Sequence, residues 1–159
     1  MHDYYRENGV REICHKVKEE KDTFEKHHAV MIIANDLLSR NLVHKGDFLI
    51  PAPQHKGRAE YTRDIAEIIA MRTGAYICDI LRCEPHRPLY EQKVLDMKLE
   101  LKMRICGGVP AAGRLFFVDN VIDTGLTFRE ADRLLGNRLI PLIYAENREK
   151  DAQIVKDAL

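Results

Sequence analysis

The stretch FFVDNVIDTGLTF, Phe116 to Phe128, places two acids, two threonines and one glycine after an apolar run, and these are residue types that can bind polar groups. Its apolar start predicts a buried strand, and LTFREADRLLG, closed by Gly136, predicts a helix. A turn between strand and helix faces the free N–H groups and the positive dipole end of that helix, which favour a phosphate. Gly125 lets the backbone approach closely, and Thr124 and Thr127 add hydroxyl donors.

Asp119, at the end of the apolar run, adds a group that phosphate-binding turns do not need. A carboxylate accepts hydrogen bonds from sugar hydroxyls. The chain contains neither G-x-x-x-x-G-K-[ST] nor G-x-G-x-x-G after a strand, so a triphosphate or a dinucleotide is not favoured, and ribose 5-phosphate fits the residues present. The alternative is a plain capped helix, because Thr127 and Glu130 have capping-box spacing. Capping explains neither Asp119 nor Asp123.

Helices and strands can be predicted on both sides of this stretch from the spacing of apolar residues. Apolar residues at helical period predict helices at about 24–40 and 61–72, and apolar runs predict strands in DFLIPAP, AYICDIL, RLFFVD and RLIPLIYA. Strands that alternate with helices predict an α/β fold around a mainly parallel sheet. Ligands bind such sheets beyond the carboxyl ends of the strands, which is where Asp119 and the following turn should lie.

The length of 159 residues and a 45% hydrophobic content predict one domain, 1–159, with a real core. The segment 1–28 is rich in charges and predicts a solvated helix. The polar segment 82–105 contains Pro85 and Pro88, which interrupt regular structure, and predicts a long mobile loop.

The balance of 25 basic and 25 acidic residues gives no net positive field for nucleic acid. No secretory signal is recognisable, and the longest apolar run, AVMIIA, is far short of the roughly 20 residues of a membrane span. We therefore expect a cytoplasmic protein without membrane partners. The four cysteines form no C-x-x-C pair and read as ordinary thiols.

Phe116 to Phe128 resembles the signature of type I phosphoribosyltransferases, in which four apolar residues precede two acids, two apolar residues, an acid or hydroxyl, Thr, Gly and a closing hydroxyl. The resemblance implies a three-layer α/β fold, a mainly parallel sheet flanked by helices, here with a small or reduced hood. It implies that the 5-phosphate of phosphoribosyl pyrophosphate (PRPP) is held by Asp123, Thr124, Gly125, Leu126 and Thr127. Asp119 keeps the first of the two acids that reach the ribose hydroxyls, and Asn120 replaces the second. This departure puts turnover in question more than binding.

PAPQHKGR, Pro51 to Arg58, follows the first strand, where this family carries a pyrophosphate-binding loop. The resemblance assigns that role to His55, Lys56, Gly57 and Arg58; the alternative is a surface turn with ordinary charges. P-x-P-x-H, LRCEPHRPLYEQK and VDNVIDTG are together similar to the ComF-like branch, which is linked with DNA uptake. The resemblance spans about residues 45 to 145, and the cysteine-rich zinc module of that branch is absent from this sequence.

By this resemblance, the reaction displaces pyrophosphate from ribose, and Mg²⁺ arrives with PRPP, near Asp119. Catalytic candidates are Asp119, Asn120 and Asp123. The segment 82–105 would close as a flexible lid, with Arg82 and Lys93 as candidates to touch the diphosphate. Tyr144 is the candidate wall of the base pocket, and its alternative is a core tyrosine at a strand end.

Two functions stay open from the sequence. The first is a transferase that joins ribose 5-phosphate from PRPP to a nitrogenous base or related nucleophile. The second is a ComF-like or regulatory protein that binds a phosphoribosyl ligand without turnover. Asn120 discriminates between them. A homodimer is compatible with either function.

Overall fold

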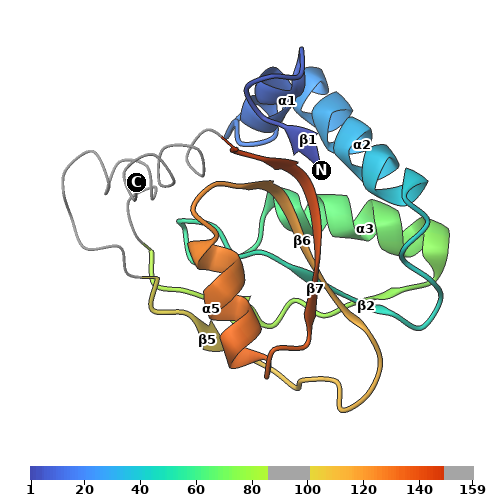
Figure 1. Ribbon diagram of the computed structural model, residues 1–159, viewed down its shortest axis with the longest axis vertical. Helices are drawn as coiled ribbons and strands as arrows, with labels where there is room; N and C mark the ends of the chain where they lie inside the picture. Colours follow the sequence, from blue (N-terminus) through green and yellow to red (C-terminus); the bar gives the residue numbers. More distant parts are fainter. Residues whose placement is uncertain (86–100, 149–159) are drawn as a thin grey trace, which may run out of the picture.

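The computed structural model describes residues 1–85 and 101–148. Helices and strands alternate along most of this chain (Figure 1). In order they are β1 (His2–Asp3), α1 (Val10–Lys16), α2 (Phe24–Ser39), β2 (Phe48–Pro51), α3 (Tyr61–Thr73), β3 (Tyr76–Ile77), β4 (Leu81–Arg82), β5 (Arg104–Ile105), β6 (Leu115–Ile122), α5 (Leu126–Leu134) and β7 (Leu139–Glu146).

A five-stranded sheet forms the centre of the molecule, in the order β1-β7-β6-β2-β3. Its pairings are parallel in the residues that the structure describes. The central strand β6 pairs with β2 through Leu115 to Val118 and with β7 as far as Ile122. Buried strands of a parallel sheet are apolar on both faces, which explains the run LFFV. The predicted α/β fold with a mainly parallel sheet is confirmed.

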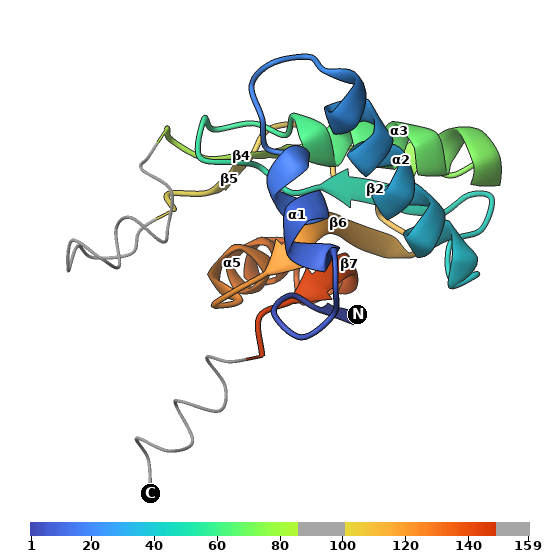
Figure 2. The same cartoon turned by 90° about the horizontal axis from the view of Figure 1, so that it is seen from above.

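Helices cover both faces of this sheet (Figure 2). Phe116 and Val118 pack in one core beneath α1, α2 and α3, whereas Leu115 and Phe117 pack in a second core with α5 and the β4–β5 pair. This alternation follows from the two-residue period of a strand. It continues to the end of β6, so Asp119 and Asn120 have side chains on opposite faces.

The N-terminal segment differs from the predicted solvated helix. Residues His2 and Asp3 pair with Ala145 and Glu146 of β7 as an edge strand of the sheet. Helix α1 follows and buries Val10 and Cys14, and Val17 is buried just after it. These three side chains are separated by four and then three residues, which places them on one face of a helix. The same spacing can be read from the sequence. The segment is therefore part of the folded domain.

The predicted strand in AYICDIL is also divided. Only Tyr76 and Ile77 join the main sheet, and Leu81–Arg82 pairs antiparallel with Arg104–Ile105 in a separate two-stranded sheet. Both ends of the predicted loop 82–105 are thus paired, and its positions 86–100 lie outside the described residues. No helix in the described part of the chain combines the length and apolarity needed to cross a membrane.

Candidate functional site

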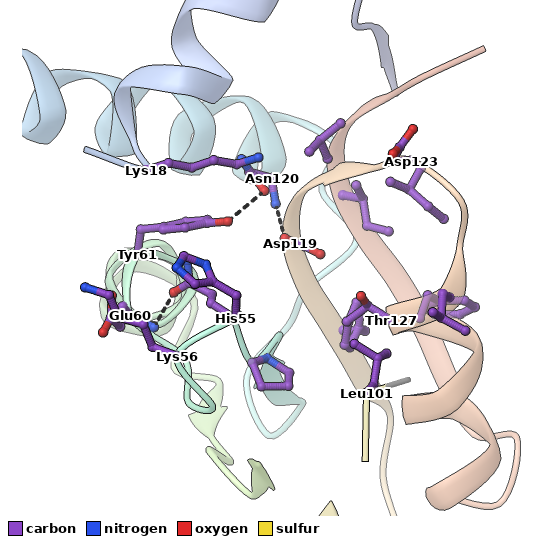
Figure 3. A pocket seen from close by; sticks show the side chains of 18 of the residues that line it. Lys18, His55, Lys56, Glu60, Tyr61, Leu101, Asp119, Asn120, Asp123 and Thr127 are labelled. Atoms are coloured by element: carbon purple, nitrogen blue, oxygen red, sulfur yellow. Dashed lines mark hydrogen bonds between the residues drawn. The ribbon is translucent and has the colours of Figure 1, made fainter. Parts of the chain in front are cut away.

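A pocket of about 730 Å³ lies at the carboxyl ends of β2 and β6. Three segments that are distant in the sequence line it: the end of β6 with the turn into α5, the loop after β2 with the start of α3, and the segment that follows α1 (Figure 3). This is the edge where open parallel sheets bind their ligands. The pocket is therefore the candidate site.

The turn between β6 and α5 has the geometry of an anion-binding turn. Gly125 has a φ angle of 77° and precedes the first residue of the helix, Leu126, whose N–H donates to the Thr124 hydroxyl over 3.2 Å. The N-cap residue itself, Gly125, makes no side-chain cap hydrogen bond. Thr127 lies inside its first turn, so the capping box with Glu130 is not formed. First-turn N–H groups without carbonyl partners lie at the pocket, where Gly125 and Thr127 form part of the lining.

Asn147 holds this turn in place. Its side-chain amide donates to Oδ1 of Asp123 over 2.9 Å, and its backbone N–H donates to the Ile122 carbonyl over 2.9 Å. These bonds tie the end of β7 to the turn. Asn147 is buried, and nothing in its sequence surroundings marks it as a partner of Asp123. Asp123 lies at the surface of the turn, on the pocket wall.

Asp119 lies within β6 and faces the pocket. Its Oδ1 accepts a hydrogen bond from the N–H of Asn120 over 2.8 Å. Burial raises the pKa of the Asp119 carboxyl to about 6, although this hydrogen bond and the charge of Lys18 oppose the rise. The carboxylate is mainly ionised at neutral pH and can accept hydrogen bonds from hydroxyl groups in the pocket.

Asn120 has a different environment from its neighbour. It is only 1% exposed; its amide donates to the Cys14 carbonyl over 3.3 Å, and its Oδ1 accepts from the Tyr61 hydroxyl over 3.4 Å. The side chain thus joins β6 to α1 and α3. Asn120 is also part of the pocket lining, but strand alternation turns its amide towards the helices, and its catalytic role beside Asp119 stays a prediction.

The loop after β2 brings only part of its predicted set to the pocket. His55 and Lys56 line the pocket, and the Lys56 Nζ lies 3.1 Å from Oε1 of Glu20. Gly57 is buried instead: a Cβ there would lie 2.4 Å from the Cys83 carbonyl oxygen, at a φ of 100°. Arg58 is exposed, 3.9 Å from Glu60, and is not part of the lining. Gly57 shapes the loop and His55 and Lys56 face the site.

The other predicted residues lie elsewhere. The Arg82 guanidinium bonds to Asp79 and to backbone carbonyls, away from the pocket, and Lys93 lies outside the described residues. Tyr144 is 3% exposed in the core beneath the helices, its ring 4.8 Å from that of His2, and burial raises its pKa to about 12. Tyr144 is a core tyrosine and not a pocket wall.

The third wall of the pocket was not predicted from the sequence. Lys18, Glu19, Glu20 and Lys26 reach the pocket from the N-terminal segment, and Tyr61 reaches it from the start of α3. The charged run KVKEEKD has no period that separates pocket-facing from solvent-facing side chains. Only the buried spacing of Val10, Cys14 and Val17 indicated that this segment packs on the sheet.

The described residues supply only part of the ligand set that a metal ion needs. No cluster of three or more His, Cys, Asp or Glu side chains with metal-binding geometry occurs in residues 1–85 and 101–148. Asp119 offers one carboxylate in the pocket. Such a donor set fits an ion that enters with most of its oxygen ligands on a phosphorylated substrate, as Mg²⁺ commonly does.

No protein-family model and no curated protein sequence matches this chain. The pocket and the motif resemblance are therefore the observations that bear on function.

Proposed function

We propose that the protein is a phosphoribosyltransferase that transfers the ribose 5-phosphate group of PRPP to a nitrogenous base or related nucleophile and releases pyrophosphate. The supporting observation is the order of charges across the pocket. Lys18, the His55 ring and Lys56, which is paired with Glu20, lie on one side of Asp119, and the helix start with Thr127 lies on the other (Figure 3). A ligand with two anionic ends joined by a polyol matches this order, and PRPP is such a ligand.

The fold is consistent with this proposal. A parallel sheet with helices on both faces is shared by many α/β proteins, and the type I phosphoribosyltransferase fold is one arrangement compatible with it. In that arrangement the N-terminal segment, which carries Lys18 and Glu20 over the pocket edge, would serve as a reduced hood. This would explain how a chain of 159 residues covers its site.

In the proposed reaction, the 5-phosphate binds the N–H groups and hydroxyls of the turn Asp123 to Thr127, and Asp119 accepts hydrogen bonds from the ribose hydroxyls. The ring is then held while positive charge develops at the anomeric carbon, which the Asp119 carboxylate stabilises electrostatically. Lys56 compensates part of the charge of the departing diphosphate, and the His55 ring offers it a hydrogen bond. Mg²⁺ bound to PRPP would add charge neutralisation at the diphosphate.

The second candidate, a regulatory protein that binds a phosphoribosyl ligand without turnover, is favoured by one observation. The residue that replaces the family's second acid, Asn120, is buried and bonded to Cys14 and Tyr61. Of the two positions of the acid pair, only Asp119 would then contact the ribose. Binding would survive this loss more readily than catalysis.

A turnover assay separates the two candidates. The full chain is incubated with PRPP, Mg²⁺ and a panel of purine and pyrimidine bases, and pyrophosphate is measured. We expect base-dependent pyrophosphate release, and a fall of at least a hundredfold in kcat/KM for Asp119→Asn, because the neutral amide no longer stabilises the cationic ring.

The control for this assay is ribose 5-phosphate binding to the same variant, which should persist because the turn into α5 is unchanged. PRPP binding without pyrophosphate release for every base would favour the regulatory candidate. Equal kcat/KM for the wild type and Asp119→Asn would remove Asp119 from the catalytic machinery.

A further inference from the structure

The N-terminal wall of the pocket carries Lys18, to which the proposed reaction assigns no step. Lys18 lines the pocket, and its side chain points towards Asn120 and Tyr61 in Figure 3. No carboxylate in the described part of the chain lies within ion-pair distance of its Nζ, whereas the neighbouring Lys16 and Lys56 are each paired with a glutamate. Its charge acts on Asp119. Lys18 is therefore available for an anion in the pocket.

Lys18 comes shortly after helix α1, which Asn120 holds in place through a hydrogen bond to Cys14. The Cys14 carbonyl, which accepts from the Asn120 amide over 3.3 Å, lies one helical turn before Lys18. The Lys18 N–H donates to the His15 carbonyl over 3.1 Å, and Val17 between them is buried without solvent exposure. The hydrogen bond between the Asn120 amide and the Cys14 carbonyl thus fixes where the chain leaves α1 and enters the pocket wall.

The two hydrogen bonds made by the side chain at position 120 require an amide. The Asn120 side chain donates to one partner, Cys14, and accepts from another, the Tyr61 hydroxyl. A carboxylate could accept from Tyr61 but would face the Cys14 carbonyl as a second acceptor. The replacement of an acid by asparagine and the presence of a lysine at the site are consequently two parts of one arrangement.

We infer that Lys18 binds the diphosphate end of the ligand and that Asn120 is the positioning residue that places Lys18 there. This inference rests on the proposed function. Lys18 lies on the same side of Asp119 as His55 and Lys56, opposite the turn that would take the 5-phosphate, so two lysines and a histidine ring together face one end of the ligand. Lys56 is already paired with Glu20, which leaves Lys18 as a cation for the ligand on this wall. A doubly or triply charged diphosphate matches such a cluster better than a single carboxylate does.

Paired titrations test the role of Lys18. The affinities of the full chain for PRPP and for ribose 5-phosphate, both with Mg²⁺, are measured by calorimetry for the wild type and Lys18→Met. We expect Lys18→Met to lower the affinity for PRPP at least tenfold and to leave the affinity for ribose 5-phosphate within twofold. Lys21→Met, an exposed lysine of the same segment outside the pocket lining, should change neither.

A double-mutant cycle tests the positioning role of Asn120. Asn120→Asp should lower PRPP affinity in the wild-type background, whereas in the Lys18→Met background it should have little further effect, because the two changes remove one interaction. A merely structural role of Asn120 would weaken binding equally in both backgrounds. Ribose 5-phosphate binding by each variant verifies that the site is folded.

The outcomes separate this inference from the function on which it rests. If the wild type prefers PRPP to ribose 5-phosphate and Lys18→Met keeps that preference, Lys18 does not bind the diphosphate, and the proposed function stands. If the wild type shows no preference for PRPP, both are overturned. Additive effects in the cycle would overturn the role of Asn120 alone.

Discussion

Asn120 is the residue at which the chain departs from the motif that it resembles, and the structure supplies a physical reason for the departure. Its amide and carbonyl groups satisfy a buried backbone carbonyl and a buried hydroxyl that come from two helices. Buried polar groups are costly when they lack partners. The position therefore connects the stability of the N-terminal segment with the chemistry of the site.

We expect Asn120→Asp to destabilise the protein by about 1–3 kcal/mol at neutral pH, because the Cys14 carbonyl loses its hydrogen-bond donor and faces a carboxylate. The loss should shrink as the pH falls and the new carboxyl becomes protonated, since it can then donate. Urea unfolding at pH 5 and pH 7.5 measures both effects. Asn41→Asp is the matched control, exposed on the surface, and should change the unfolding free energy by less than about 0.5 kcal/mol. Equal stability of the two variants would contradict the role assigned to the amide.

Gly57 and Gly125 show how much of a residue's role the sequence reveals. Both were assigned to phosphate binding from the motif resemblance, and both have positive φ angles. A Cβ at Gly57 would strike the Cys83 carbonyl, whereas a Cβ at Gly125 would meet nothing closer than Ile122 Cδ1 at 3.9 Å. Gly57 is thus required by packing and Gly125 by its conformation at the pocket, a difference that only the structure reveals.

At the scale of elements, the two-residue strand β1 depends on side chains for its position at the sheet edge. His2 lies 2.6 Å from Glu7 through Nδ1 and 2.6 Å from Asp36 of α2 through Nε2. Asp36 also pairs with Arg40, and the Tyr144 ring packs beside His2. With both ring nitrogens facing carboxylates, the doubly protonated imidazolium is the favoured form.

A pH dependence of stability follows. The hydrogen bond to Asp36, followed by that to Glu7, raises the pKa of His2 above its ordinary value of 6.5. Its stabilising contribution is therefore complete below about pH 6.5 and is lost as the pH rises through the raised value. We expect the Tm difference between the wild type and His2→Gln to be largest near pH 6 and to diminish towards pH 9. A difference that grows with pH would contradict this assignment.

The long elements could be predicted from the sequence and the short ones could not. Helices α2 and α3 span several turns, so their apolar period is visible, and the observed bounds lie within one residue of those expected. Strands β1, β3, β4 and β5 have two residues each and carry no period. Their pairing is decided by tertiary contacts, such as the ion pairs of Asp79 with Arg63 and Arg82 next to β3 and β4.

At the scale of the whole molecule, the pocket is assembled from three chain segments, and the sequence indicated two of them. The β6–α5 turn and the loop after β2 follow strands, where parallel sheets place their functional groups, so topology alone predicts that they meet. The N-terminal wall follows a short helix whose packing depends on Cys14 and Asn120, which are 106 residues apart. Tyr144 was misassigned because the side-chain alternation of β7 relative to the pocket cannot be read before the register is known.

The central claim is that the turn between β6 and α5 holds a sugar monophosphate. Its most direct test is calorimetric titration of ribose 5-phosphate into Gly125→Val and Gly136→Val. These glycines flank α5, with φ angles of 77° and 68°, so both substitutions strain the backbone but only the first changes the pocket. We expect Gly125→Val to weaken binding at least tenfold, about 1.4 kcal/mol, and Gly136→Val to retain the wild-type affinity. Equal affinities of both variants and the wild type would contradict the claim.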